Sequence, residues 1–475
     1  MSFYSVLEKM CQEKPEHILF SFWQDKMRRN VSVEQWVTEV FNFAAWMEKR
    51  KIKNMHIEVV CSYSYEWYVI VFGLIISGNV AVSINPDLSE EELLFQIKNA
   101  DIQELYYDSR TDLGEVLSSL PQTMLKKTLK EVVHEAEKEA MGKSVRDEGS
   151  DEEQCSFILF SSGTSGMPKG VMLSQKNLLN IRVRMSENLD GTAGMIWMPV
   201  YHIGGITFTL DLMCHPITIC IGENYRSMIR DIKRFEPAVL ILVPSQLEFL
   251  LKKCKKDEEL RQMVFKKLKY IYTAGAALDV FSIDRLEELQ VECINVYGLT
   301  EVAGPLVEGS SKKNGSVGKF RAENEMKLDN GELTVKGPSV MKGYYNCPEE
   351  TANALRDGWF YTGDLVSVDS EGELHITGRS KNIIILSNGE NISPENLERK
   401  IKDLNGVEEV IVTGRNNVLE AVIYCGEKDS KECRMYLKEQ IRKMNKKLPR
   451  FQQIQKITFG NQPFEKTGSG KIKRF

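Results

Sequence analysis

The chain has 475 residues, of which 42% are hydrophobic and 27% are charged, and this composition excludes collagen-like and disordered proteins. At about 150 residues per domain, the length predicts roughly three domain-sized units. The 62 lysines and arginines are outnumbered by 67 aspartates and glutamates, which gives a net charge of −5. Because no overall positive field exists to hold a polyanion, we expect no nucleic-acid partner.

Cysteine spacing and hydropathy predict a reduced, cytoplasmic protein. The ten cysteines include no Cys-x-x-Cys pair, so neither a zinc ribbon nor a disulfide framework is indicated. The amino terminus carries acids and lysines where a secretion signal would be apolar. The most apolar stretch, 67–76, is shorter than the about 20 residues that a membrane-spanning helix needs, which predicts a core helix and no stable membrane insertion.

The first third of the chain alternates between helical and strand patterns, which predicts a layered α/β core. The expected helices are 34–50, 65–77 and 89–99, and the expected strands are 56–62 and 80–84. Residues 134–154 are polar, with eight acidic and three basic residues, and predict a surface crossing without chemistry. A buried strand is expected at 155–161, and the segment 234–251 predicts a strand that passes through Pro244 into a helix.

Further along the chain, short glycine-rich β segments at 315–378 predict antiparallel or barrel-like structure that closes the large domain. A small α+β unit follows, with expected helices at 394–402 and 431–447 and strands at 407–413, 419–424 and 454–459. We therefore predict a large N-terminal α/β domain (1–378) with a β-barrel-like part, a hinge (379–381) and a small mobile C-terminal α+β domain (382–475).

The most informative segment is the loop SSGTSGMPKG at 161–170, which follows the expected strand at 155–161. Its glycines let backbone amides approach an anion, its hydroxyls donate hydrogen bonds, and Lys169 adds a positive charge, so the loop suits a polyphosphate. A Walker-type NTPase is disfavoured because Pro168 stands where G-x-x-x-x-G-K-[ST] has glycine. A flexible Gly/Ser loop is the alternative interpretation.

In combination with later motifs, the chain resembles the superfamily of adenylate-forming enzymes, which includes acyl-CoA synthetases, adenylation domains of peptide synthetases and luciferases. The resemblance covers nearly the whole chain. Its motifs, in family order, are the loop at 161–170, MPVYHIGG at 198–205, TAGAALD at 273–279, NVYGLTEVAG at 295–304, GYYNCPEET at 343–351, DGWFYTGDL at 357–365, GRSKNIIILSNGENISPENLE at 378–398 and KTGSGKIKR at 466–474.

The resemblance implies that ATP activates a carboxylic acid as an acyl adenylate, with release of pyrophosphate, before the acyl group passes to a thiol. Lys471 matches the lysine that bridges the carboxylate and the α-phosphate. Glu301 matches a Mg²⁺ ligand, and Thr300 a donor to the α-phosphate; a carboxylate is a suitable hard ligand for Mg²⁺. The phosphate loop would contribute Ser161, Ser162, Gly163, Thr164, Ser165, Gly166 and Lys169.

The same resemblance implies a nucleoside site, two orientations of the C-terminal domain and an acyl pocket. Asp364 and Arg379 would hold the ribose, and Tyr297 would stack on adenine, with Gly298 next to it. Lys381 matches the hinge that removes Lys471 from the site after adenylation. Three sets complete the assignment: Gly275, Ala276 and Ala277 along the base, His202 and Gly205 at the acyl pocket, and Gly389 at the thiol channel.

The substrate class and the thiol acceptor are less constrained by the sequence. His202 stands where amino-acid adenylation domains usually carry an aspartate, and a substrate ammonium would lose its charge partner there, which favours an uncharged acyl tail. Fatty, aryl and dicarboxylic half-acids all fit this interpretation. Coenzyme A is the expected acceptor, and a carrier protein acting in trans is the alternative because the loop at 415–417 is short. An amino-acid adenylating enzyme, a luciferase-like oxygenase and a non-catalytic nucleotide-binding protein are the competing hypotheses.

Overall fold

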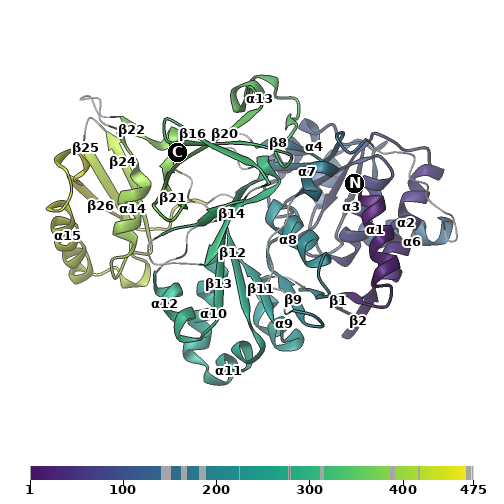
Figure 1. Ribbon diagram of the computed structural model, residues 1–475, viewed down its shortest axis with the longest axis horizontal. Helices are drawn as coiled ribbons and strands as arrows, with labels where there is room; N and C mark the ends of the chain where they lie inside the picture. Colours follow the sequence, from purple (N-terminus) through teal and green to yellow (C-terminus); the bar gives the residue numbers. More distant parts are fainter. Residues whose placement is uncertain are drawn as a thin grey trace.

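The computed structural model contains two large mixed sheets and a small C-terminal unit (Figure 1). It describes residues 2–140, 151–161, 168–180, 189–223, 225–275, 278, 280–310, 315–321, 323–385, 391–415, 418–466, 472 and 474. The α/β fold class that the sequence predicts is confirmed.

The larger sheet has fourteen strands among the described residues and divides into a parallel and an antiparallel half. In the parallel half, neighbouring strands from β13 to β1 run in the same direction, and β2 pairs antiparallel with β1. The order in this half is β13 (Glu292–Leu299), β12 (Tyr270–Ala274), β11 (Val239–Leu242), β9 (Ala193–Ile196), β10 (Thr218–Ile221), β1 (Ile18–Gln24) and β2 (Met27–Ser32).

The antiparallel half corresponds to the glycine-rich segment, and it continues the same sheet beyond β13. Its order is β14 (Gly304–Ser310), β15 (Gly318–Phe320), β21 (Glu373–Arg379), β20 (Trp359–Val368), β17 (Glu332–Lys336) and β16 (Glu325–Asp329), and β19 (Leu355–Arg356) pairs with β20. One short helix, α13 (Pro348–Ala354), interrupts these strands and was not expected from the sequence. Pro348 at its first turn is compatible with a helix start.

The smaller sheet has seven strands and supplies the β-α units of the first third of the chain. Its order is β18 (Gly343–Tyr344), β8 (Lys169–Ser174), β7 (Cys155–Ser161), β4 (Val80–Ile84), β3 (His56–Val60), β5 (Glu104–Tyr107) and β6 (Leu125–Thr128). The helices of the first half are α1 (Phe3–Glu13), α2 (Val33–Lys49), α3 (Tyr65–Ile76), α4 (Glu90–Asn99), α5 (Gly114–Ser119), α6 (Leu129–Ala140), α7 (Gln175–Leu179), α8 (Ile203–Met213) and α9 (Met228–Phe235).

Aromatic side chains join the two sheets through helices α2 and α3. Trp36 of α2 meets Phe20 of β1 with ring centroids 5.6 Å apart, and Trp67 of α3 meets Phe157 of β7 at 6.4 Å. Nearly every residue of α3 is buried, which confirms the prediction of a core helix. No helix in the described part of the chain has the length and apolarity needed to cross a bilayer.

The expected surface crossing at 134–154 is wrong for its first seven residues, which continue helix α6 to Ala140. The helix forms because Val132, Ala136 and Ala140 bury one face against α2 and α3, while its acids face outward. One of these acids, Glu139, accepts a 2.7 Å hydrogen bond from Lys49. Residues 141–150 lie outside the described part of the chain.

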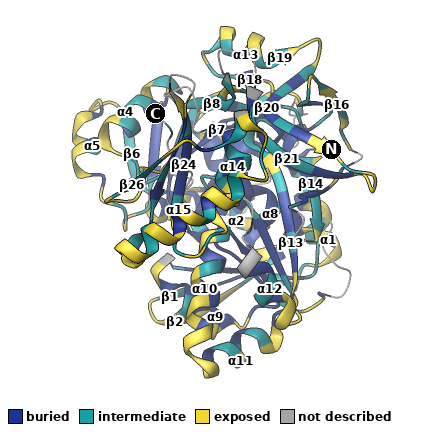
Figure 2. Cartoon of the chain, turned by 90° about the vertical axis from the view of Figure 1, so that its left-hand side faces the viewer, coloured by how far each residue is buried: buried dark blue, intermediate teal, exposed yellow. Residues whose placement is uncertain are grey.

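The C-terminal unit has a hydrophobic core of its own, built by residues between Ile392 and Ile454. It contains β24 (Glu409–Arg415), β25 (Val418–Tyr424), β26 (Lys456–Gly460), α14 (Pro394–Lys402) and α15 (Lys431–Asn445), together with the short pair β22 (Ile384–Ile385) and β23 (Asn391–Ile392). Figure 2, which faces this unit, shows exposed residues along α15. Figure 1 places α10 (Pro244–Lys256), α11 (Glu258–Lys267) and α12 (Val280–Glu288) beside the parallel half of the larger sheet.

A half-buried carboxyl on α2, bonded to the first residue of α3, makes stability depend on pH. The pKa of Glu39 is raised to about 7: burial is the largest cause, the charges of Glu137 and Glu66 act in the same direction, and the 2.9 Å hydrogen bond from Tyr65 opposes them. The folded protein therefore holds a proton on Glu39 that the unfolded chain releases near pH 4.5. Stability from this group is complete below that value and is lost as pH rises through about 7.

We expect Glu39→Gln to stabilise the protein at pH 8 and to have little effect at pH 4.5, because glutamine still accepts the Tyr65 hydrogen bond and carries no charge. The gain should be at most about 3 kcal/mol, reduced by the partial exposure of the site. Thermal melting of both proteins at several pH values measures it. A difference in melting temperature that is the same at every pH would contradict the assignment.

Candidate active site

The described residues of the predicted nucleotide site gather where the carboxyl ends of β12 and β13 meet the antiparallel half of the sheet and the edge of the smaller sheet. Ligands of open α/β sheets bind at the carboxyl ends of strands. Gly275 directly follows β12, and Tyr297, Gly298 and Thr300 lie at the end of β13 and in the turn after it. Asp364 and Arg379 come from β20 and β21.

Asp364 interacts with two other predicted site residues, Tyr297 and Arg379. It is only 2% exposed, and its Oδ2 accepts a 2.6 Å hydrogen bond from the phenol of Tyr297. Its Oδ1 lies 2.5 Å from Nε of Arg379, the residue directly opposite it on β21. Burial, and next the charge of Asp364, raise the pKa of Tyr297 far above its usual range, so the phenol remains a donor. Each carboxylate oxygen has a second lone-pair position, which leaves acceptor sites for a ribose diol.

The bond between Tyr297 and Asp364 shows that the antiparallel half curls back on itself. Their strands, β13 and β20, are separated in the sheet by β14, β15 and β21. Four strand spacings in a flat sheet would amount to about 19 Å, whereas the two side chains are 2.6 Å apart. This curvature agrees with the barrel-like part expected from the sequence, although no pair of described strands closes the sheet into a barrel. It brings together the residues predicted for the nucleoside site.

Position 298 requires glycine for a structural reason, in addition to its predicted place beside the nucleotide. A Cβ at this position would lie 1.9 Å from the carbonyl oxygen of Gly304, on the neighbouring strand β14. Tyr297 and Gly298 also stand at a register shift between β13 and β14. Only glycine permits this approach of the two backbones, so the residue shapes the turn that presents Thr300 and Glu301.

Glu301 and Lys169 come from different sheets and meet at Tyr344. Glu301 lies in a short 3₁₀ turn, Thr300–Val302, after β13. The phenol of Tyr344 donates a 3.0 Å hydrogen bond to Glu301 Oε1, and Nζ of Lys169 lies 5.1 Å from the centroid of the same ring. Burial and then the charge of Glu301 raise the pKa of the Tyr344 phenol.

Glu301 fits the part of a Mg²⁺ ligand that depends on phosphate and water for its other bonds. The described residues contain no cluster of three or more His, Cys, Asp or Glu side chains that could hold a metal alone. Mg²⁺ in nucleotide sites is commonly held by one or two carboxylates together with substrate phosphates. A single carboxylate near a phosphate loop matches that donor set.

Lys381 contributes more to the site than the sequence indicated. It lies in the 3₁₀ turn Ser380–Asn382, two residues after Arg379. Its pKa is lowered to about 8: burial is the largest cause, the charges of Arg379 and Lys169 act in the same direction, and those of Asp364 and Glu301 oppose the shift. The Lys381 amine is therefore within electrostatic range of Asp364 and Arg379, which are predicted to hold the ribose, and of Lys169 and Glu301, which are predicted to act at the phosphates. The hinge assignment alone did not predict this position.

His202 and Gly205 lie at the start of the buried helix α8. Nδ1 of His202 accepts a 3.2 Å hydrogen bond from the backbone N–H of Gly204 and caps the helix. Phe208 of the same helix packs edge-on against Tyr272 of β12, with centroids 5.9 Å apart. Helix α8 therefore contacts β12, the strand that Gly275 directly follows. The role of His202 and Gly205 in acyl binding stays a prediction.

Nine predicted residues lie outside the described part of the chain, and their roles stay predictions. They are Ser162, Gly163, Thr164, Ser165 and Gly166 of the phosphate loop, Ala276 and Ala277 after β12, Gly389, and Lys471. Residues near both ends of the phosphate loop, Ser161 and Lys169, are described. Ser161 pairs with Lys169 across β7 and β8, so the loop joins two adjacent antiparallel strands.

The C-terminal unit contacts the large unit through the start of α14. Ser393 Oγ donates a 2.5 Å hydrogen bond to the carbonyl oxygen of Thr377 on β21. Asn382 donates a 2.6 Å bond to Glu395 of α14, which ties the proposed hinge region to the same helix. The junction therefore adjoins Arg379, the residue that pairs with Asp364.

The chain's last segment is held by carboxylates of the C-terminal unit. Lys466 lies 2.5 Å from Glu409 of β24 and forms a β-bridge with Ile472. Arg474 forms an ion pair with Glu398 of α14 and lies 3.4 Å from Glu395. The residues that make these contacts lie before and after Lys471 in the sequence.

Comparison with known proteins identifies the family. The sequence profile of the family described as "AMP-binding enzyme" matches residues 7–345, and that of the "AMP-binding enzyme C-terminal domain" matches residues 381–475. The chain belongs to the AMP-binding enzyme family. This AMP-binding enzyme is 26% identical to the 2-succinylbenzoate–CoA ligase of Enterococcus faecalis, over 98% of this chain and 96% of that one. It is 25% identical to a long-chain-fatty-acid–CoA ligase of Bacillus subtilis, over 86% of this chain and 82% of that one.

Solved structures share the fold of this AMP-binding enzyme. The o-succinylbenzoate CoA synthetase of Bacillus subtilis, in complex with its acyl-adenylate intermediate, superposes with a TM-score of 0.82 at 22% identity. The alignment covers 100% of this chain and 97% of that one. An anthranilate CoA ligase in complex with anthranoyl-AMP gives the same TM-score at 18% identity, over 100% and 96% of the two chains. These likenesses agree with the two-unit architecture described above.

Proposed function

We propose that this AMP-binding enzyme is an AMP-forming acyl-CoA synthetase, which activates a carboxylic acid with ATP and transfers the acyl group to coenzyme A. The observation that carries the proposal is the convergence of Tyr297, Asp364 and Arg379 with Glu301 and Lys169 at one end of the larger sheet. A diol-accepting carboxylate next to a cation and a metal-type carboxylate suits a nucleoside triphosphate. A non-catalytic nucleotide-binding protein would not need this cationic and metal-binding end of the site.

Each of the site residues is proposed to have a separate role in forming the acyl adenylate. Asp364, with its position fixed by Arg379 and Tyr297, would accept hydrogen bonds from the ribose and set the angle of the nucleotide. Thr300 would donate to the α-phosphate, and Lys169 would neutralise the outer phosphates as pyrophosphate forms. Magnesium, held by Glu301 and phosphate oxygens, would add charge stabilisation. Catalysis would therefore depend on positioning two anions, the carboxylate and the α-phosphate, rather than on a covalent enzyme intermediate.

The second half-reaction requires that the C-terminal unit changes its place. We propose that Lys381 is the hinge, that Lys471 serves adenylation, and that rotation removes Lys471 and brings Gly389 toward the incoming thiol. The junction between the domains near 379–381 is short, and hinges absorb their backbone change in a few residues. Polar contacts from Ser393, Glu395 and Arg399 join the start of the C-terminal unit to β21 and the turn after it, which suits an interface that must break and reform.

The acid is proposed to carry no ammonium next to the carboxylate that reacts, because His202 offers no anion to pair with one. The similar proteins act, by name, on 2-succinylbenzoate and on long-chain fatty acids, so both classes are candidates. The same names favour coenzyme A over a carrier protein as the acceptor. We propose a cytoplasmic location on the grounds of the reduced cysteines and the amino-terminal sequence.

A single assay tests the proposal. The purified protein is incubated with ATP, Mg²⁺ and a panel containing 2-succinylbenzoate, aryl acids, fatty acids of several lengths and amino acids, with and without coenzyme A. We expect acid-dependent exchange of labelled pyrophosphate into ATP without coenzyme A, and sustained release of AMP with it. Exchange without any stimulation by coenzyme A would favour a carrier-protein acceptor. If no acid supports exchange or AMP release, the proposal fails.

A further inference from the structure

Tyr344 stands between two opposite charges that do not pair with each other. Its phenol donates to Glu301 Oε1 at 3.0 Å, and Nζ of Lys169 lies 5.1 Å from the centroid of its ring. Within the part of the chain that the structure describes, Lys169 and Glu301 form no ion pair. The carboxylate has a neutral donor and the ammonium has an aromatic face, so each is held without being neutralised.

The backbone around Tyr344 is bonded to both charged elements. The N–H of Met341 donates a 2.8 Å hydrogen bond to the carbonyl oxygen of Glu301, and the N–H of Tyr345 donates a 2.7 Å bond to that of Gly170. Tyr344 itself pairs with Val171 through strands β18 and β8. One five-residue segment, 341–345, is therefore attached both to the Glu301 turn of the larger sheet and to the Lys169 strand of the smaller sheet.

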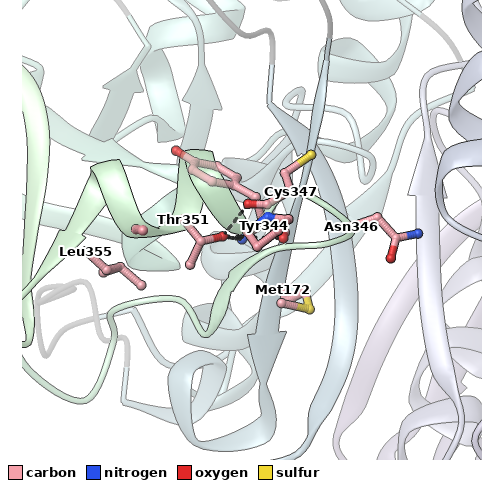
Figure 3. Close-up of a pocket in the computed structure, with 8 residues that line it drawn as sticks. Met172, Tyr344, Asn346, Cys347, Thr351 and Leu355 are labelled. Carbon is pink, nitrogen blue, oxygen red and sulfur yellow. Dashed lines mark hydrogen bonds between the residues drawn. The ribbon is translucent and has the colours of Figure 1, made fainter.

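The place of Tyr344 is fixed from its other side by helix α13 (Figure 3). Oγ1 of Thr351 accepts a 2.9 Å hydrogen bond from the N–H of Tyr344 and donates a 2.8 Å bond to the carbonyl oxygen of Cys347. Gly343 has a φ of +140°, and a Cβ there would lie 2.7 Å from Cγ2 of Thr351. The tyrosine also borders an apolar hollow of about 490 Å³ with Met172, Cys347 and Leu355.

We propose that Tyr344 is a positioning residue that keeps Glu301 available to magnesium and Lys169 available to phosphate. This inference rests on the proposed function. The hydroxyl orients the carboxylate and occupies a lone pair of one oxygen, and the ring holds the ammonium away from that carboxylate. Without the hydroxyl, Glu301 is free to turn toward Lys169, and an ion pair between them would compete with both the metal and the phosphates.

The test measures ATP binding by calorimetry with no acid present, once with Mg²⁺ and once with EDTA. In the unaltered protein, Mg²⁺ is expected to tighten ATP binding. In Tyr344→Phe this tightening should shrink by about 10-fold, the scale of one hydrogen bond to a charged group, while binding in EDTA changes little. Phenylalanine keeps the ring beneath Lys169. A loss of ATP binding with Mg²⁺ but not in EDTA therefore shows that Glu301 is no longer positioned, and not that the whole site is damaged.

Two comparisons complete the test. Tyr345→Phe is the matched control, since it removes a neighbouring phenol that donates to Asp101 at 2.8 Å, and it should leave the effect of Mg²⁺ unchanged. In a Glu301→Gln background, Tyr344→Phe should cause no further loss, because the group on which it acts is gone. The titration in EDTA shows that Tyr344→Phe is folded, because a variant that binds ATP there as the unaltered protein does has kept its site.

The outcomes separate this inference from the proposed function. An unchanged effect of Mg²⁺ in Tyr344→Phe, or a further loss in the Glu301→Gln background, overturns the positioning role. Failure of every acid in the exchange assay, with ATP and Mg²⁺ still bound and the Tyr344→Phe effect present, overturns the proposed function and leaves the positioning role standing.

Discussion

Lys471→Ala is expected to lower acyl-adenylate formation by about 10²- to 10³-fold, the usual scale for removing one electrostatic contact of a transition state. The carboxylate and the α-phosphate are both anions, and a bridging ammonium reduces their repulsion as they meet. Thioester formation from a supplied acyl adenylate should be spared, because the proposed rotation has already removed this lysine. Pyrophosphate exchange measures the first step, and thioester formation from synthetic acyl adenylate and coenzyme A measures the second.

Lys456→Ala is the control for that experiment. Lys456 is another cation of the same C-terminal unit and lies 2.9 Å from Glu420, so its removal should leave both steps unchanged. Equal losses in the two steps for Lys471→Ala would contradict the proposed exchange of the two domain orientations.

Asp364→Ala is expected to weaken ATP binding by about 10- to 100-fold, because two hydrogen bonds from the ribose to a buried carboxylate would be lost. It should also lower the free energy of unfolding by about 3–5 kcal/mol, since the partly buried Arg379 is left without its partner. Asp364→Asn should retain more of the stability, because the amide oxygen still accepts the hydrogen bond from Tyr297. Calorimetric titration with ATP and thermal melting measure the two effects separately.

Asp329→Ala provides a matched control. Asp329 of β16 accepts a 3.0 Å hydrogen bond from Tyr361 of β20, in the same antiparallel half of the sheet. Its removal breaks a second tyrosine–aspartate pair that has no predicted role at the nucleotide, and ATP affinity should not change. Unchanged ATP affinity in Asp364→Ala would remove Asp364 from the ribose role, whatever happens to stability.

The sequence predicts those elements whose boundaries are determined by neighbouring residues. Helix α14 begins at Pro394 and ends at Lys402 as expected, because proline suits the first turn and the apolar residues recur at helical spacing. Strand β4 likewise has the expected bounds, Val80–Ile84, since it is a short apolar run between turn residues. Helix α6 was not predicted, because its many acids made residues 134–154 look like a polar surface crossing although one face of the helix is buried.

Contacts between distant segments could not be predicted from the sequence. The bond between Tyr297 and Asp364 depends on the curvature of five strands, and no local pattern specifies that curvature. Tyr344 belongs to a motif that was recognised, yet its bond to Glu301 joins residues 43 positions apart from two sheets. The position of Lys381 among four charged residues also depends on tertiary structure. The only sequence signal for Tyr344 is its place after Gly343 in the motif at 343–351.

The ion pairs of Arg474 and Lys466 have a consequence for the speed of turnover. Both cations bind carboxylates of the C-terminal unit itself, so the described residues before and after Lys471 in the sequence would travel with that unit in the proposed rotation. The lysine could then neither arrive early nor remain behind when the unit turns. Delivery of its charge would be timed by diffusion of a whole folded body through solvent. Turnover should consequently slow as glycerol or sucrose thickens the medium, even when every substrate is saturating.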